Sequence, residues 1–195
     1  VHSLVVTVVF ITDRLMLGHY SEDALGSMQM SGPFLWSLYT VLGAFTVGIL
    51  AVVGRAVGAD DARRAATTTA TSLLFAVAVG IVVMVIGLSV REALTVAMSD
   101  PASTDPLLLT MAQDYMFYYL LSAPLHMVGL SGTVALQASG DTRTPMLLSV
   151  ITGVVNVAAN WALIFGHLGL PELGAAGAGM ASSISLALSG LLTLG

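Results

Sequence analysis

The sequence predicts an all-α membrane protein built as a bundle of six transmembrane helices. Of its 195 residues, 56% are hydrophobic and only 9% are charged, and its mean hydropathy is +0.93. About a quarter of the residues of a soluble domain are charged, because its surface must be solvated by water. A membrane-spanning helix needs about 20 mainly apolar residues. The length therefore accommodates about six spans with short connections and no separate soluble domain.

Apolar runs separated by charged, glycine or proline residues define the expected spans. We expect Pro33 to kink or break the second span and Pro124 to lie within the fourth, because proline removes a backbone donor from a helix. A polar segment rich in Asp and Pro, SDPASTDP, separates the third span from the fourth. The expected spans are residues 1–19, 24–57, 65–90, 115–138, 146–166 and 175–195.

The arginines predict how the bundle is oriented, since Arg and Lys accumulate in cytoplasmic loops. The connections after the second and fourth spans carry four arginines, whereas the alternate connections carry one, Arg91. The four are Arg55, Arg63, Arg64 and Arg143. We therefore expect a multi-pass protein of the plasma (inner) membrane with a cytoplasmic N-terminus.

Composition also excludes several classes of function. The chain has no cysteine, which excludes disulfides, thiolate metal sites and a cysteine nucleophile. Its net charge of −5 leaves no basic surface for a nucleic-acid backbone. The four histidines are too scattered to form a metal site, and no organic cofactor is expected. The chain begins with Val and stops within an apolar segment, so we expect a fragment of a longer polypeptide.

Asp13 is the clearest polar residue inside an expected span. It lies about seven residues, or roughly 10 Å of helix, from the end of that span. An acid near the centre of a membrane costs about 2.5 to 3.5 kcal/mol and usually faces a bundle interior or an aqueous cavity. Burial disfavours the charged carboxylate, so water access can change its protonation. The alternative is that Asp13 lies nearer the interface and extends outward to water.

Asn156 and Asn160 form a second polar feature, in the fifth span. They are four residues apart and therefore lie on one face of the helix. Their expected depth is close to that of Asp13, so two amides and a carboxyl group would form a pocket for a proton or a small cation. The alternative is that both amides bind neighbouring helices and serve packing alone.

Weaker signals lie in the fourth span and in the glycines. His126 follows Pro124, whose kink can open a cavity, although a single histidine is also compatible with packing. Gly129-Leu130-Ser131-Gly132 is similar to the nucleophile motif of rhomboid intramembrane proteases, but the sixth span lacks the histidine base that activates such a serine. The glycine clusters at 54–58 and 174–179 indicate close helix packing or an adaptable pocket.

Four segments resemble one transporter family in the order in which that family carries them. ITDRLMLGHYSEDALGSM is similar to the first-span segment of multidrug and toxic compound extrusion (MATE) transporters, and GILAVVGRAVGADDARRA to their first cytoplasmic loop. ALQASGDTRTPM resembles the turn after their fourth span. VVNVAANWALIFGHLGLPELGAAGAGMASSIS resembles their fifth span, outer loop and the start of the sixth. The resemblance covers nearly the whole chain.

The resemblance implies a fold, an activity and a set of residues. MATE transporters have twelve spans in two six-helix lobes, so this chain corresponds to an N-terminal lobe whose partner, the C-terminal lobe, is missing. Asp13 matches the family's cation-coupling acid and Asn156 a nearby asparagine, while Ser182 falls where many members place a hydroxyl residue. Asn160 departs from the pattern, because the archaeal-type, proton-coupled branch tends to carry a second acid there. An amide does not titrate at neutral pH, which puts coupling by a carboxylate pair in doubt.

Residues and resemblance together predict a secondary active antiporter that exports drugs or other cationic amphipathic compounds, driven by H⁺ or Na⁺. The expected coupling residues are Asp13, Asn156 and Asn160, with Ser182 and His126 in a substrate cavity. A lipid-linked oligosaccharide flippase of the same superfamily is the alternative, disfavoured because Arg14 is the only arginine deep in a span. A rhomboid-like protease and a non-transporting membrane subunit are weaker alternatives. The expected partners are a small-molecule substrate and membrane lipid.

Overall fold

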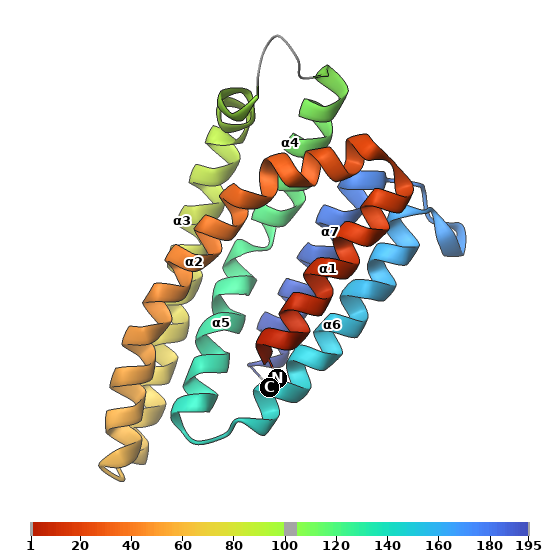
Figure 1. Ribbon diagram of the computed structural model, residues 1–195. Helices are drawn as coiled ribbons and strands as arrows, with labels where there is room; N and C mark the ends of the chain where they lie inside the picture. Colours follow the sequence, from red (N-terminus) through yellow and green to blue (C-terminus); the bar gives the residue numbers. More distant parts are fainter. Residues whose placement is uncertain (1, 100–104, 195) are drawn as a thin grey trace.

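The computed structural model describes residues 2–99 and 105–194, and these ranges contain helices and no strand. The helices are α1 (His2–Tyr20), α2 (Glu22–Gly58), α3 (Ala62–Met98), α4 (Pro106–Leu121), α5 (Ala123–Ala138), α6 (Arg143–Ile164), the short 3-10 helix η1 (His167–Gly169) and α7 (Gly174–Leu192). Figure 1 shows them packed as one elongated bundle. The predicted all-α fold is confirmed.

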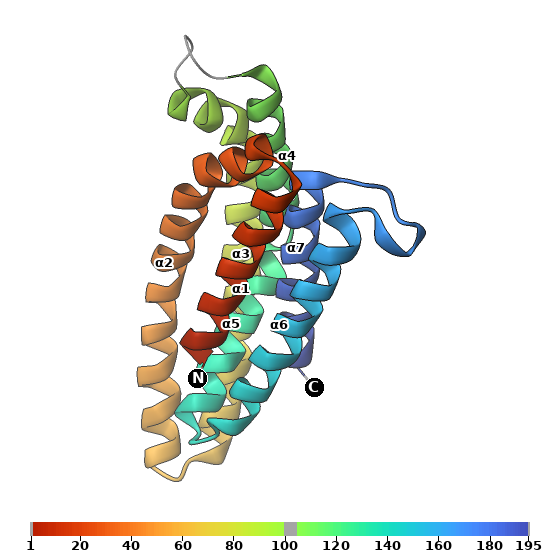
Figure 2. The same ribbon diagram turned by 45° about the vertical axis from the view of Figure 1, so that its right-hand side comes forward.

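Most of the helices are long and apolar enough to cross a membrane. Among the described residues, α2, α3, α6 and α7 meet this test singly, and α4 with α5 makes a fifth span bent by 52°. α1 is not among them and carries Asp13 and Arg14 within its length. It nevertheless runs alongside α6 in both ribbon views (Figures 1 and 2). This arrangement agrees with a six-helix lobe.

The fourth expected span is longer than residues 115–138 and is broken. It begins at Pro106, where the carboxylate of Asp105 accepts a hydrogen bond of 2.8 Å from the backbone N–H of Leu107. Proline fits the first turn of a helix because its missing N–H has no partner there. Ser122 separates α4 from α5, and Pro124 lies in the first turn of α5. Pro124 thus starts a new helix after the break.

Pro33 has a milder effect than a break. α2 is continuous from Glu22 to Gly58 with Pro33 inside it. Figure 1 shows the helix crossing the end of the bundle and then turning down along α3. Proline removes one backbone hydrogen bond and crowds the preceding turn, which bends a helix without ending it when neighbouring helices hold both halves.

The third span also exceeds its expected limit of residue 90, because α3 continues to Met98. The polar connection expected at residues 99–106 is therefore short, and its positions 100–104 lie outside the described residues. The first position of the first expected span, residue 1, lies outside them too.

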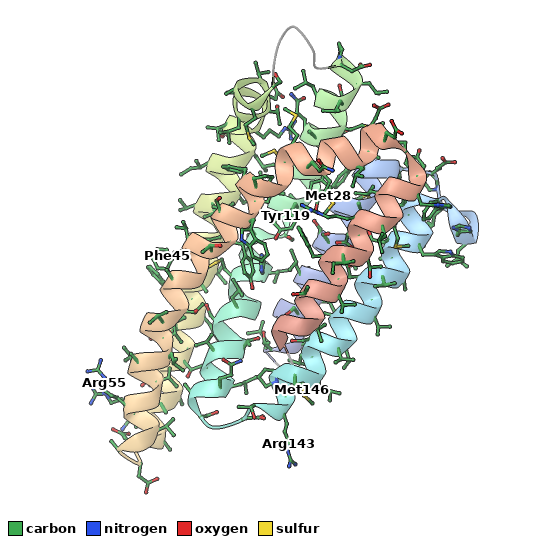
Figure 3. All side chains as sticks on the ribbon, in the orientation of Figure 1. Met28, Phe45, Arg55, Tyr119, Arg143 and Met146 are labelled. Carbon is green, nitrogen blue, oxygen red and sulfur yellow. The ribbon has the colours of Figure 1, made fainter. Side chains whose placement is uncertain are left out.

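The connections alternate between the two ends of the bundle, as the arginine pattern requires. α1 begins at the end that holds the α2–α3 and α5–α6 turns, and the α1–α2 and α6–α7 connections lie at the opposite end (Figures 1 and 2). Figure 3 shows Arg55 and Arg143 at the first of these ends. The arginines of the two turns therefore share one end of the molecule.

The two glycine clusters differ in their packing. A Cβ atom added at Gly177 of α7 would lie 2.6 Å from the carbonyl oxygen of Leu163 in α6, and one at Gly179 would lie 2.8 Å from the carbonyl of Tyr115 in α4. At Gly54 and Gly58 of α2 a Cβ atom would meet nothing within 4 Å. The indicated close packing is therefore correct for α7 and wrong for α2, which does not place its small residues against a neighbour.

Candidate cation and substrate cavity

The helices surround a cavity of about 220 Å³. Five of the six spans contribute to its wall, because α1, α2, the α4–α5 pair, α6 and α7 each place side chains there, whereas no described residue of α3 lines it. These side chains include Asp13, Tyr39, Tyr119, His126, Asn156 and Ser182. Four of the five residues expected at a functional site, all except Asn160, therefore line one cavity.

Asn160 lies behind the wall and joins the polar residues to one another. Its side chain is fully buried, and its Nδ2 donates to Oδ1 of Asp13 at 2.6 Å and to Oδ1 of Asn156 at 2.9 Å. Asn156 Nδ2 in turn donates to Oγ of Ser185 on α7 at 3.2 Å. The one-turn spacing on α6 thus brings the predicted carboxyl and amide groups together, with α7 as a third support.

Two groups of this cluster are suited to a cation: the side-chain oxygen of Asn160, unpartnered among the described residues, and the carboxylate of Asp13. Within the described part of the chain, the buried Oδ1 of Asn160 accepts no hydrogen bond. It therefore has free lone pairs close to the Asp13 carboxylate. Carboxylate and amide oxygens are the ligands that hard cations prefer, and a carboxylate also accepts a proton. The chemistry of these groups suits a proton and a hard cation alike.

Arg14 follows Asp13 in the sequence but does not neutralise it. Its guanidinium carbon lies 4.3 Å from the centre of the Phe10 ring, one turn earlier on α1. Neighbouring positions on a helix point about 100° apart, which explains the separation. Asp13 is thus left with the Asn160 amide as its hydrogen-bond donor among the described side chains.

An aromatic chain along the cavity wall is the feature that sequence reasoning missed. Consecutive ring centroids in this chain are 5.4 to 6.4 Å apart. Its members, in spatial order, are Phe10, Trp36, Tyr39, His126, Tyr119 and Tyr115. Spacings of three and four residues, at Trp36 with Tyr39 and Tyr115 with Tyr119, are the sequence signal that indicates such a shared face.

His126 lies at the centre of this aromatic chain. It stacks on Tyr39 at 5.4 Å with an interplanar angle of 24° and meets Tyr119 edge-on at 6.4 Å. Its expected place in the cavity agrees with this geometry. The ring is buried among aromatic neighbours, so its immediate contribution is shape and stacking.

The hydroxyl residues of α7 form the remaining polar wall. Ser182, Ser185 and Ser189 all line the cavity. Ser182, the hydroxyl residue implied by resemblance, is one helical turn from Ser185, which accepts the Asn156 hydrogen bond. Ser185 therefore connects to the Asp13 cluster more directly than the residue that was expected.

Comparison with known proteins identifies the family. The MatE family model matches residues 1–162, more than four-fifths of the chain. The chain belongs to the MATE family. MATE proteins are membrane transporters and not enzymes, and this chain has the long apolar helices of a multi-pass membrane protein. Ser131 of the protease-like motif lies on α5, outside the wall of the Asp13 cavity.

Curated relatives of this chain are named for different substrates. The chain is 26% identical over 173 residues to the "Probable multidrug resistance protein NorM" of Thermotoga maritima, covering 89% of this chain and 36% of that protein. It is 25% identical over 188 residues to the "FAD transporter" of Shewanella oneidensis, covering 94% of this chain and 41% of that protein. The chain therefore spans only part of the length of these relatives.

Solved MATE structures share the fold. An outward-facing conformation of a multidrug resistance MATE family transporter superposes with a TM-score of 0.87 at 19% identity, covering 98% of this chain and 41% of that structure. An inward-facing conformation gives a TM-score of 0.85 at 19% identity, covering 96% of this chain and 41% of that structure. The arrangement of helices around the cavity is thus that of one MATE lobe.

Proposed function

We propose that this chain is the N-terminal lobe of a secondary active antiporter that exports cationic amphipathic compounds in exchange for H⁺ or Na⁺. The hydrogen bond between Asn160 and Asp13 at the cavity wall carries the proposal. It holds a desolvated carboxyl group where an ion and a substrate can reach it in turn. A second lobe, supplied by the rest of a MATE-length chain, closes the central pathway.

The coupling step follows from the contacts of Asp13. The empty carboxylate accepts the Asn160 hydrogen bond and so ties α1 to α6. A proton or Na⁺ on the carboxylate competes with that bond and changes how α1 packs. An ion shifts such an equilibrium only by its different affinity for the two states. Because Phe10 and Val9 of α1 also line the cavity, movement of α1 reshapes the substrate site.

The wall of the cavity supports a preference for aromatic cations. Aromatic faces attract cationic groups and stack on planar rings. Asp13 is the only acid among the described residues that line the cavity, and no arginine lines it there. A flippase for lipid-linked sugars needs cationic groups for pyrophosphate, so the cavity favours the exporter over this alternative.

Orientation is part of the same proposal. We place the α2–α3 and α5–α6 turns in the cytoplasm of a plasma-membrane protein, because these turns carry four of the six arginines. In this orientation, α1 begins on the cytoplasmic side and Asp13 lies in its outer half. Release of substrate is then directed outward.

The decisive experiment replaces Asp13 by Asn in the full-length transporter. Efflux of a fluorescent aromatic cation from cells should fall by about tenfold or more, because a hydrogen-bonded charge contributes about 1.5 to 3 kcal/mol. The matched control is Asp141→Asn, which changes a partly exposed acid in the α5–α6 turn. Both variants must reach the membrane at the level of the unmodified protein.

Undiminished efflux by Asp13→Asn would refute the coupling role and favour a non-transporting subunit. Asn160→Asp is the second variant, because it introduces the second acid that the archaeal-type branch tends to carry. A changed pH profile of transport in that variant would link the Asn160 amide to the coupling ion, whereas an unchanged profile would limit Asn160 to packing.

A further inference from the structure

A second hollow lies between α2, α3 and α5, away from the Asp13 cavity. It encloses about 500 Å³ and shares no lining residue with that cavity. The residues that carry the argument are Phe45 and Gly48 of α2, Thr68, Ser72 and Phe75 of α3, and Ser131 of α5. We call this hollow the α2–α3 groove. Phe45 and Phe75 are 46% and 56% exposed and their rings are 6.2 Å apart, so the groove opens on the outer surface of the described bundle.

The groove contains hydroxyl groups that lack partners. Ser131 is 1% exposed, and its Oγ forms no hydrogen bond with any described residue. Thr68 and Ser72, one turn apart on α3, also make no side-chain hydrogen bond within residues 2–99 and 105–194. By contrast, Thr67 and Thr71 donate to carbonyl oxygens one turn earlier, at 3.0 and 2.9 Å. Thr68 and Ser72 are half-buried and Ser131 is buried, and a buried unpartnered hydroxyl costs free energy unless a ligand binds it.

Arginines lie where the groove meets the end of the bundle. Arg64, Thr68 and Ser72 are spaced by four residues and share one face of α3. On α2, Arg55 lies three residues after Val52 of the groove. Figure 3 shows Phe45 and Arg55 on the same side of α2. Neither Arg55 nor Arg64 forms an ion pair with a described residue.

The acids of the same turn do not neutralise these arginines. The Asp61 carboxylate caps α3 by accepting the backbone N–H of Arg64 at 2.9 Å. Asp60 is exposed at the tip of the turn. Together with Arg63, the turn carries three arginines against two aspartates, which leaves a positive charge at the mouth of the groove.

Three kinds of side chain follow one another along the groove. Cationic side chains lie at the end of the bundle, hydroxyl groups come next, and aromatic and apolar side chains follow. We propose that the α2–α3 groove binds one anionic phospholipid of the leaflet that contains the α2–α3 turn. Arg55 and Arg64 hold its phosphate, Thr68 and Ser72 donate to the oxygens of its glycerol backbone, and an acyl chain lies against Phe45 and Phe75. Polybasic segments beside a membrane attract anionic lipids in this way.

The lipid site is independent of the proposed transport cycle. None of the groove residues takes part in the hydrogen bonds that join Asp13, Asn156 and Asn160. Failure of the Asp13→Asn experiment would leave the lipid proposal intact. Failure of the lipid experiment would leave the antiporter proposal intact.

The first test removes the charges. Full-length protein is reconstituted in nanodiscs of phosphatidylcholine with or without phosphatidylglycerol, and retained lipid is counted by native mass spectrometry. Arg55→Gln and Arg64→Gln should each weaken retention of phosphatidylglycerol about fivefold, and about 30-fold when combined. The matched control is Arg143→Gln, which removes an arginine at the same end of the bundle but on α6 (Figure 3).

The second test fills the groove. A Cβ atom at Gly48 would meet nothing within 4 Å, so the side chain of Gly48→Leu starts in open space, at a position that lines the groove proposed for the acyl chain. Gly43 of the same helix is equally free of contacts but does not line the groove. Gly48→Leu should abolish preferential retention of phosphatidylglycerol, whereas Gly43→Leu should preserve it. Both variants replace glycine by a better helix former, so folding is matched.

Three results would overturn the proposal. Equal retention of phosphatidylcholine and phosphatidylglycerol would show no preference for an anionic lipid. A response to the arginine variants without a response to Gly48→Leu would show attraction to the membrane surface and no groove site. If glycerol phosphate alone displaced the bound lipid at equal concentration, the site would recognise free phosphate.

Discussion

Asn160 of α6 donates a hydrogen bond of 2.6 Å to Asp13 of α1, joining residues that are 147 positions apart in the sequence. Both side chains are buried, with exposed fractions of 0% and 6%. The same Nδ2 also donates to Asn156. One amide therefore sets the position of the only acid in the cavity wall among the described residues, and it ties the first helix to the sixth.

We expect Asn160→Leu to destabilise the lobe. The change removes a donor to two buried acceptors, and a buried acceptor without a partner costs about 1 to 3 kcal/mol. The measurement is the thermal unfolding midpoint of the full-length protein in detergent. In a double-mutant cycle, Asn160→Leu should cost less when Asp13→Leu is already present. Additive costs would show that the two side chains do not interact.

We expect Gly177→Ala to destabilise the contact between α6 and α7. The added Cβ atom would lie 2.6 Å from the Leu163 carbonyl oxygen, and backbone atoms do not move aside easily, so the cost is about 1 to 3 kcal/mol. Gly43→Ala is the control, since its Cβ would meet nothing within 4 Å. That variant should be stabilised by up to about 1 kcal/mol. Equal midpoints for the two variants in a thermal unfolding assay would contradict the packing described above.

We expect the ring of His126, and not its titration, to matter for transport. His126→Phe keeps the stacking on Tyr39 and should retain most efflux of an aromatic cation. His126→Ala removes both aromatic contacts, each worth about 0.5 to 1.5 kcal/mol, and should raise the KM for that cation several-fold. The measurement is efflux as a function of substrate concentration. Loss of transport in His126→Phe would instead assign a role to the imidazole nitrogens.

We expect Asp141 to give the α5–α6 turn a pH-dependent stability. Its Oδ1 accepts hydrogen bonds from the backbone N–H groups of Thr144 and Arg143, both at 3.0 Å. Hydrogen bonds from Thr144, and more weakly from Arg143, lower the pKa of Asp141 below its ordinary value of 3.8. A lowered pKa stabilises the folded state above the ordinary value, and that contribution is lost as the pH falls through the lowered pKa.

The unfolding midpoint of Asp141→Ala should therefore lie below that of the unmodified protein at pH 7, and the difference should narrow below about pH 4. Asp141→Asn keeps a side-chain oxygen that caps the helix and should retain most of the stability without this pH dependence. A difference between Asp141→Ala and the unmodified protein that stays constant from pH 7 to pH 3 would contradict the prediction.

Local patterns were sufficient for much of the fold and part of the candidate site. Hydropathy identified the spans, and the one-turn spacing of Asn156 and Asn160 placed both amides on the face that meets α1. The same reasoning was incomplete where a neighbour decides the outcome. It left open whether Pro33 kinks or breaks α2, and the helix bends and continues. The close packing expected at Gly54 is wrong, because a Cβ atom there would meet nothing within 4 Å.

The sequence by itself determined the membrane class, the order of the spans and Asp13 as the acid to examine, because hydropathy and helical periodicity are properties of neighbouring residues. Only the tertiary structure decided that Asn160 binds Asp13 while Arg14 lies over Phe10, that six rings form one chain along the cavity, and that Thr68, Ser72 and Ser131 share a groove. These contacts depend on how each helix is tilted and rotated against the others. Tilt and rotation are set by side-chain packing between segments far apart in the chain.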